Sequence, residues 1–270
     1  MNKNYIMPSG YNQNYIKEKG VEWRSLSYNS SITLSERKLN VLLPYGYSGE
    51  KEYPVLYLLH GIGGDENEWK GAGPEYIISN LLEEHKIKEF ITVLPNVRTR
   101  ADDKGNPDDI FTLEHFRVFD MFREELEENI MPFMEENFKT RKGRENTAIA
   151  GLSMGGRESL YIGLTRPGTF GYIGAFSPAY GIFPYTNNGV TEKGLFKKEE
   201  FKLSDNYKDN TFLMLANGDN DLVTKEQSYK YHNVLMKNNT KHLYKIYIGG
   251  HDFSVWSNGL YEFVQHIFNE

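Results

Sequence analysis

Short, nearly continuous apolar runs constrain the fold of this chain more than any other feature. The stretches PVLYLLH at 54–60, FITVLP at 90–95 and TAIAGL at 147–152 contain almost no charged or strongly polar residue. Such runs are typical of strands that are buried on both faces, as in the middle of a parallel sheet. Three further runs of the same character follow at 172–176, 211–216 and 242–248.

Helical patterns lie between these runs. The first follows Pro74, a favourable residue at a helix start, and the longest has apolar residues recurring at spacings of three and four. We expect helices at 75–84, 116–138, 154–165, 225–237 and 260–268. With antiparallel candidates at 21–29 and 37–43, the alternation predicts an α/β fold. Its central sheet has about eight strands, is mostly parallel and carries helices on both faces.

The organisation along the chain favours one domain. Residues 1–20 are polar and rich in Asn and Tyr, which predicts an N-terminal arm, and no repeat or Pro/Ser linker divides residues 21–270. The hydrophobic fraction of 39% is sufficient for a core. Two long segments, 96–112 and 181–210, interrupt the alternation, and loops of this length are often functional.

Composition excludes several classes of protein. The chain has no cysteine, so disulfide scaffolds, thiol nucleophiles and cysteine-based zinc sites are ruled out. A net charge of −6 without a run of five basic residues argues against nucleic-acid binding. The N-terminal residues lack the apolar segment of a signal peptide, and no stretch approaches the length of a membrane span. Localisation stays open between the cytoplasm and secretion.

The stretch AIAGLSMGGRES at 148–159 places Ser153 between a predicted strand and a predicted helix. Gly151 and Gly155 flank the serine in the G-x-S-x-G pattern of a nucleophile elbow, where the tight turn leaves no room for side chains. The following helix directs its first amides at the site, which favours negative charge there. The alternative is a structural turn rich in glycine that happens to contain a serine.

A nucleophilic serine needs a base, and the base needs an orienting acid. Two later motifs, NGDND and GGHDF, each follow a predicted strand and therefore reach the same edge of the sheet as the serine. The order Ser, acid, His indicates His251 as the base and either Asp221 or Asp219 as the acid. The remaining histidines precede the serine, or lie on helices or at the wrong end of a strand: His60, His85, His115, His232, His242 and His266.

An acyl-transfer site also needs hydrogen-bond donors for the oxyanion. The backbone amide of Met154, directly after the serine, is one candidate. The second candidate is the amide of Ile62 in LLHGIGGDENEW, where glycines let the backbone turn its amides inward. Losing one such donor typically costs about 2.7–4 kcal/mol of transition-state stabilisation.

Four blocks together carry a family resemblance: LYLLHGIGGDENEW, AIAGLSMGGRES, GDNDLV and GGHDFSVW. From about Tyr53 to the C-terminus the chain resembles the esterase D-type α/β hydrolases. Within these it resembles most the feruloyl esterase domains of bacterial xylanolytic enzymes, in carbohydrate esterase family 1. The resemblance implies an α/β-hydrolase fold with Ser153 as nucleophile and His251 as base. Its G-x-N-D pattern favours Asp221 over Asp219 as the acid, although relatives commonly carry a neutral residue at Asp219.

The resemblance also implies a reaction and a substrate. We expect a serine carboxylesterase that hydrolyses feruloyl or other hydroxycinnamoyl esters of plant cell-wall xylan through an acyl-enzyme. Its partner would be an ester-substituted polysaccharide or oligosaccharide, with no cofactor or metal, and secretion is favoured. The acidic cluster at 102, 103, 108 and 109 lacks the spacing of a calcium loop, which favours a solvated loop. The alternatives are an acetyl xylan esterase, an acyltransferase or a non-catalytic carbohydrate-binding module.

Aromatic residues near the motifs are candidates for the acyl pocket, because flat apolar walls suit a cinnamoyl ring. The tryptophans among them are equally good candidates for core residues beneath the loops. The candidates are Trp69, Tyr180, Phe253 and Trp256, together with Phe183 and Tyr185 in the loop after a sheet strand.

Overall fold

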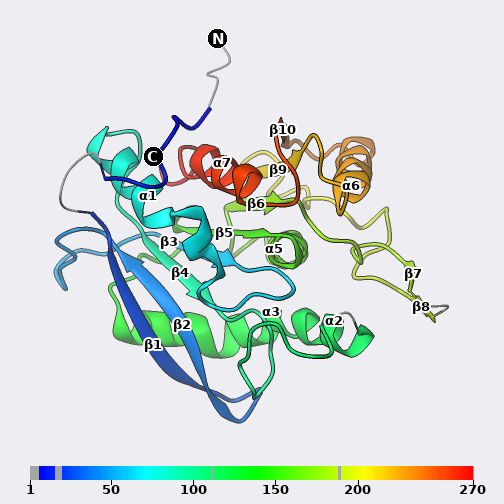
Figure 1. Ribbon diagram of the computed structural model, residues 1–270, viewed down its shortest axis with the longest axis horizontal. Helices are drawn as coiled ribbons and strands as arrows, with labels where there is room; N and C mark the ends of the chain where they lie inside the picture. Colours follow the sequence, from blue (N-terminus) through cyan, green and yellow to red (C-terminus); the bar gives the residue numbers. More distant parts are fainter. Residues whose placement is uncertain (1–5, 16–19, 111, 188–189, 270) are drawn as a thin grey trace.

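The computed structural model describes residues 6–15, 20–110, 112–187 and 190–269. At its centre lies an eight-stranded sheet with the strand order β1-β2-β4-β3-β5-β6-β9-β10 (Figure 1). The first two strands pair antiparallel, and all neighbours from β4 to β10 are parallel. The predicted mostly parallel sheet of about eight strands is therefore confirmed. The sheet strands are β1 (Glu22–Ser30), β2 (Ser35–Leu43), β3 (Val55–Leu59), β4 (Ile91–Pro95), β5 (Thr147–Leu152), β6 (Tyr172–Phe176), β9 (Phe212–Gly218) and β10 (Leu243–Tyr247).

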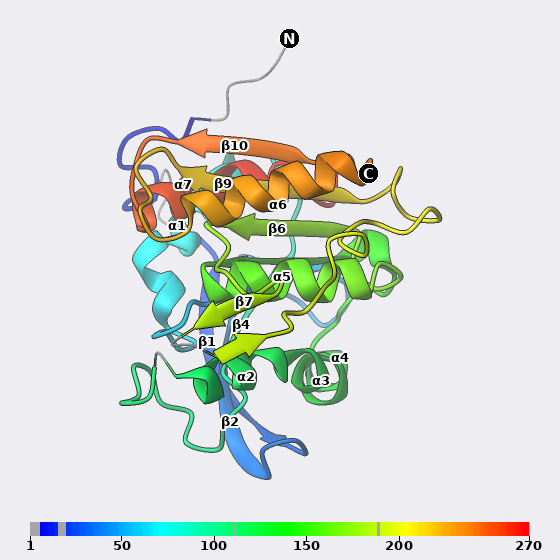
Figure 2. The same ribbon diagram turned by 90° about the vertical axis from the view of Figure 1, so that its right-hand side faces the viewer.

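Helices cover both faces of the sheet, as predicted. One hydrophobic core joins a face of the sheet to α5 and α6 through residues such as Leu160 and Leu235, and the other face packs on α1 and α7 through Ile77 and Leu260. Figure 2 looks onto α5 and α6. The helices are α1 (Pro74–Glu83), α2 (Leu113–Asp120), α3 (Phe122–Glu125), α4 (Met131–Asn137), α5 (Met154–Thr165), α6 (Lys225–Lys237) and α7 (Phe253–Phe263), with shorter turns η1 (Glu68–Ala72), η2 (Leu126–Ile130) and η3 (Arg144–Asn146).

The prediction of one long helix at 116–138 is wrong. The segment forms α2, α3, the π-helical turn η2 and α4 in succession. It begins at Leu113 because the Thr112 hydroxyl caps the amide of His115 at 3.2 Å. Pro132 has no amide hydrogen to donate into the preceding turn, and the wider π turn precedes it.

The bounds expected for the last helix, 260–268, are also wrong. The helix begins at Phe253, because the Asp252 carboxylate caps it by accepting the Ser254 amide at 2.8 Å. Gly259 lies inside this helix, where a Cβ atom would come within 2.7 Å of the Phe176 ring. The helix therefore starts immediately after the GGHDF motif and fixes the position of its histidine.

Of the two long segments, one has the expected character and the other does not. In the loop 96–112, Asp102 and Asp108 are exposed, as expected of a solvated acidic loop. Ion pairs also hold this loop, because Asp102 lies 2.8 Å from Arg98 and Asp109 lies 2.7 Å from Arg100. The segment 181–210, expected to be irregular, contains a two-stranded sheet. Its strands β7 (Tyr185–Asn187) and β8 (Val190–Glu192) are too short to produce a readable alternation.

The described part of the predicted N-terminal arm forms no helix or strand, but it packs against the domain. Tyr11 is buried, and its ring meets the Tyr261 ring of α7 edge-on at 5.4 Å. Residues 1–5 and 16–19 of the arm lie outside the described residues. Among the helices that the structure describes, none has both the length and the apolar character needed to cross a membrane.

Candidate functional site

Ser153 occupies a strained turn between β5 and α5. Its backbone angles are φ 50° and ψ −115°, a conformation that residues with side chains rarely adopt. The Ser153 amide donates to the Phe176 carbonyl at 2.9 Å, and the Ser153 carbonyl accepts the Ala179 amide at 3.0 Å. Neighbouring segments thus hold the serine in a conformation that it would not keep alone.

The glycines of this turn are required by close packing of backbone on backbone. A Cβ atom at Gly155 would lie 2.4 Å from the Leu59 carbonyl oxygen. At Gly151 it would lie 2.4 Å from the carbonyl carbon of Gly155. Because these contacts are to backbone, no side-chain rearrangement could relieve them.

Three residues predicted from different motifs form one hydrogen-bonded line. Ser153 Oγ lies 3.0 Å from His251 Nε2, and His251 Nδ1 lies 2.9 Å from Asp221 Oδ2. Ser153 follows β5, Asp221 follows β9 and His251 follows β10, so all three come from carboxyl ends of parallel strands. Asp219, the alternative acid, accepts the Gly249 amide at 3.0 Å and shapes the loop that carries His251.

The Asp221 carboxylate is fully buried and satisfied by hydrogen bonds. Its Oδ1 accepts the Val223 and Thr224 amides at 2.9 and 2.8 Å, and its Oδ2 accepts the Thr224 hydroxyl at 2.9 Å. Burial disfavours the charged carboxylate, but hydrogen bonds from His251 and the Thr224 amide outweigh it and hold the pKa of Asp221 well below its usual range. The aspartate therefore stays ionised beside the imidazole.

Sequence reasoning missed Thr224. Its only sequence signal is its position three residues after Asp221, where an aspartate side chain commonly accepts local backbone amides. Among the described residues, no group of three or more His, Cys, Asp or Glu side chains could hold a metal ion.

The two tryptophan candidates are buried. Trp69 is 1% exposed, and its Nε1 donates to the Leu59 carbonyl at 2.9 Å, so this ring is a core residue and offers no wall to a ligand. Trp256 is also buried and meets the His251 ring edge-on at 5.1 Å. Phe253 is half-buried and packs edge-on against Trp256 at 5.0 Å. These rings support the histidine loop from beneath.

Tyr180 lies next to the nucleophile turn, one residue after the Ala179 amide that binds the Ser153 carbonyl. Its ring is half-buried, 5.0 Å from the Phe116 ring and 5.3 Å from the Tyr185 ring. A cavity of about 370 Å³ is lined by Tyr180, Phe183, Tyr185, Gln227 and Lys230, among others. A larger cavity of about 610 Å³ lies at the opposite edge of the sheet, near the amino ends of β3 and β6.

The two candidate oxyanion donors belong to segments next to the serine, the start of α5 and the loop after β3. Met154 is the first residue of α5, so its amide belongs to the helix N-terminus, where negative charge is favoured. Ile62 lies in the loop after β3, and a Cβ atom at Gly61 would be 3.3 Å from Ser153 Cβ. Within the described part of the chain, neither the Met154 nor the Ile62 amide donates to a protein acceptor.

A strained serine at a strand-to-helix turn, followed in the chain by an aspartate and a histidine that reach it from later strands, is the arrangement of an α/β hydrolase. A family model named Esterase, with the description "Putative esterase", matches residues 30–267. The chain therefore belongs to this esterase family.

The chain is also similar to a solved ferulic acid esterase structure and to two curated xylanases. A solved CE1 ferulic acid esterase from the anaerobic fungus Anaeromyces mucronatus, in complex with ferulic acid, is 37% identical with a TM-score of 0.90, covering 99% of this chain and 98% of that one. An endo-1,4-beta-xylanase/feruloyl esterase from Xylanibacter ruminicola is 39% identical over 160 residues, which are 57% of this chain and 21% of the relative. Endo-1,4-beta-xylanase Y from Acetivibrio thermocellus is 26% identical over 187 residues, 61% of this chain and 16% of the relative.

These matches confirm the resemblance that the four sequence blocks indicated. The chain spans about a fifth or less of the length of the two curated xylanases that it matches.

Proposed function

We propose that this chain is a serine carboxylesterase that hydrolyses feruloyl and related hydroxycinnamoyl esters of plant cell-wall polysaccharides. The hydrogen-bonded line from Ser153 through His251 to Asp221 carries the proposal. The names of the similar ferulic acid and feruloyl esterases support the acyl group. An ester-substituted polysaccharide or oligosaccharide would be the partner, and a polymeric substrate favours a secreted enzyme.

In the first step, Ser153 Oγ attacks the ester carbonyl carbon while His251 Nε2 takes the hydroxyl proton. Asp221 keeps the proton on His251 Nδ1, so that Nε2 is the basic nitrogen, and it stabilises the imidazolium that forms. The carbonyl oxygen becomes negatively charged, and the amides of Met154 and Ile62 donate to it. The strained turn carries Ser153 Oγ at 3.0 Å from His251 Nε2, within reach for this proton transfer.

In the second step, the His251 imidazolium gives its proton to the oxygen of the leaving sugar hydroxyl as the ester bond breaks. This leaves the acyl group on Ser153 Oγ. A water molecule then attacks the acyl carbon while His251 accepts one of its protons, and the same amides stabilise the second tetrahedral intermediate. Return of that proton to Ser153 Oγ releases the acid.

The acyl group would bind beside the nucleophile turn, against Tyr180 and the cavity that this residue shares with Phe183 and Tyr185. Aromatic rings gain from offset or edge contacts with another ring, and apolar walls with a few polar groups are usual in ligand pockets. Gln227 and Lys230 supply polar groups at the same cavity. Phe253 remains a candidate for contacts on the side of His251.

The decisive experiment compares Ser153→Ala with the unchanged chain on methyl ferulate. Loss of the nucleophile should lower kcat by about 10⁴-fold or more. Ser204→Ala, at an exposed serine, is the matched control and should retain full activity. A fluorophosphonate probe should label the unchanged chain and the control but not Ser153→Ala. Full hydrolysis by Ser153→Ala would overturn the proposal.

A second assay separates the acyl groups. Ferulate and acetate released from one sample of feruloylated and acetylated xylan are measured together, and ferulate release should dominate. Release of acetate alone would reassign the chain to the acetyl xylan esterases. Transfer of the feruloyl group to an added sugar alcohol faster than hydrolysis would indicate an acyltransferase.

A further inference from the structure

Consecutive peptide groups of the loop at 60–64 each accept a hydrogen bond from a side chain or donate one to a side chain. The Ile62 amide belongs to the peptide group between Gly61 and Ile62, and the carbonyl of this group accepts His60 Nδ1–H at 2.7 Å. In a trans peptide the carbonyl and the amide point in opposite directions. The Gly61 carbonyl also accepts the Gly64 amide at 3.2 Å, so the shorter bond from His60 and this turn bond together fix the direction of the Ile62 amide.

His60 is suited to this role by its protonation state. Its Nε2 accepts the Val97 amide at 2.8 Å and lies 3.2 Å from Asn96 Oδ1, whereas Nδ1 faces the Gly61 carbonyl, which can only accept. The proton is therefore assigned to Nδ1. The side chain is fully buried, and burial lowers its pKa to about 4. A neutral imidazole with one fixed tautomer is thus a permanent donor to this peptide.

The peptide groups on either side are held by two other ionisable side chains. The Gly61 amide donates to Glu68 Oε2 at 2.6 Å, and the Ile62 carbonyl accepts His115 Nε2–H at 3.0 Å. His115 is fully buried, and burial lowers its pKa, so it too stays neutral. Three consecutive peptide groups are each bound by one side chain, and the three side chains come from three different segments.

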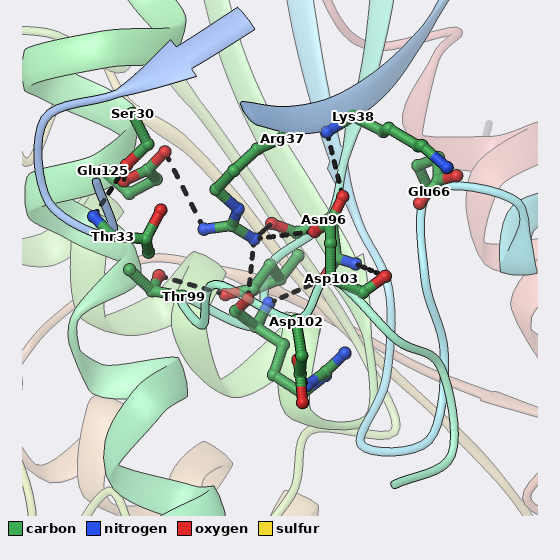
Figure 3. A network of polar contacts seen from close by, with 12 residues as sticks. Ser30, Thr33, Arg37, Lys38, Glu66, Asn96, Thr99, Asp102, Asp103 and Glu125 are labelled. Carbon is green, nitrogen blue, oxygen red and sulfur yellow. Dashed lines mark hydrogen bonds and ion pairs between the residues drawn. The ribbon is translucent and has the colours of Figure 1, made fainter. Parts of the chain in front are cut away.

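The segment after β4 carries Val97, whose amide donates to His60 Nε2, and this segment is itself anchored to the sheet (Figure 3). Arg37 of β2 is fully buried, and its Nη2 donates to the Asn96 carbonyl at 2.9 Å. Asp103 binds back to β2 by accepting the Lys38 amide at 2.9 Å. Between these anchors lies Val97, whose amide fixes the His60 ring. The segment after β4 is therefore held to β2, and through Val97 it fixes the orientation of the His60 ring.

We propose that His60, Glu68 and His115 form a loop clamp that holds the Ile62 amide in its donating direction before substrate arrives. They are positioning residues, because none of them touches the reacting atoms. The inference rests on the proposed function, which assigns the Ile62 amide to the oxyanion. A fixed donor stabilises the transition state without reorganising at the moment of reaction. Loosening the clamp should therefore lower kcat and leave KM nearly unchanged.

His115 gives the first test. His115→Phe keeps an aromatic ring in the buried site but removes the donor to the Ile62 carbonyl, whereas His115→Gln can supply an amide donor near the former Nε2. On methyl ferulate, we expect His115→Phe to lower kcat by about 10- to 100-fold, somewhat less than loss of an oxyanion donor itself. His115→Gln should recover most of that loss. A purely structural residue would show no such rescue linked to the donor.

Glu68 gives the second test on the neighbouring peptide. Glu68→Gln retains an oxygen that can accept the Gly61 amide, whereas Glu68→Ala does not. The alanine variant should again lose kcat with little change in KM, and the glutamine variant should lose much less. Glu136→Ala, at an exposed glutamate of α4, is the control and should behave like the unchanged chain. If His115→Phe fails to fold, the Glu68 pair decides the question.

Fluorophosphonate labelling gives a readout independent of turnover. Phosphonylation of Ser153 also builds charge on an oxygen that faces the oxyanion donors, so its rate should fall in His115→Phe and Glu68→Ala. Unchanged kcat and labelling rate in both variants would overturn the clamp, as would a change in KM alone. Activity in Ser153→Ala would instead overturn the proposed function, so the two failures are distinguishable.

Discussion

Two loops near Ser153, the one after β3 and the one after β10, each carry a histidine, His60 and His251. The two imidazoles differ in their burial and in their hydrogen-bond partners. His251 is partly exposed, binds Asp221 through Nδ1 and directs Nε2 at the serine hydroxyl. His60 is fully buried, and both of its nitrogens are bound to backbone groups. In the His251 loop a side chain is available for proton transfer. In the His60 loop the side chain holds a backbone amide in place, and burial is what separates these two roles.

The largest expected effect tests the first half of this comparison. His251→Gln removes the only imidazole that contacts Ser153 Oγ among the described residues, so kcat on methyl ferulate should fall by about 10⁶-fold. His85→Gln, at an exposed histidine, is the matched control and should keep full activity. A His251→Gln variant that loses less than about 100-fold would contradict the assignment of this residue as the base.

The next effect distinguishes the two carboxylates of the loop after β9, Asp219 and Asp221. Asp221→Asn preserves the size of the side chain but favours the wrong tautomer of His251, and kcat should fall by about 10⁴-fold. Asp219→Asn keeps an oxygen that can accept the Gly249 amide, so kcat should change by less than about 10-fold. Steady-state kinetics of the two variants side by side is the measurement. Equal losses would show that the choice of Asp221 over Asp219 is wrong.

The sequence predicted the functional residues of these two loops unequally well. Ser153, Asp221 and His251 each lie shortly after the end of a predicted strand, and the carboxyl ends of parallel strands meet at one edge, so the amino-acid sequence alone predicts their proximity. Glu68 and His115 bind backbone groups that lie 7 and 53 residues earlier in the chain, and a contact to a backbone group produces no recognisable residue pattern in the sequence. Sequence analysis therefore identifies reactive side chains more readily than the residues that orient a reactive amide.

The fold shows the same limit. Strands β5 and β6 and helices α5 and α6 have the predicted bounds, because each is a regular apolar pattern with a clear end. The pattern at 116–138 gave no sign of the π-helical turn, and the short hairpin of β7 and β8 lacks enough residues for a period. The burial of Trp69 also could not be foreseen, because tryptophans serve equally well as walls of pockets and as core residues.

A smaller effect tests the burial of His60 through the pH dependence of stability. The folded protein keeps this imidazole neutral down to pH about 4, whereas a histidine in the unfolded chain is protonated below about 6.5. Between these values the unfolded state binds more protons, so the free energy of unfolding should fall as the pH is lowered from about 6.5 to 4. The contribution is constant at higher pH.

For His60 the expected loss between pH 7 and pH 4.5 is about 2–3 kcal/mol. Urea unfolding of the unchanged chain and of His60→Gln at both pH values measures it, because other titrating groups cancel in the comparison. The variant should be less stable at pH 7 but should lose less stability on acidification. Parallel curves for the two proteins would contradict the neutral, buried state of His60.

The smallest effect tests the proposal that the cavity lined by Tyr180 binds the acyl group. Tyr180→Ala removes one wall of that cavity and its ring contacts with Phe116 and Tyr185, and an aromatic contact with the substrate contributes about 0.5–1.5 kcal/mol. The KM for methyl ferulate should therefore rise by about 2- to 10-fold. The ring does not touch the atoms that change charge, so it binds substrate and transition state alike and kcat should stay nearly constant. The KM for p-nitrophenyl acetate, whose acyl group has no ring, should not change. An equal rise in KM for both esters would show that the acyl ring does not bind against Tyr180. Tyr180 would then contribute only to the structure of the turn at Ala179.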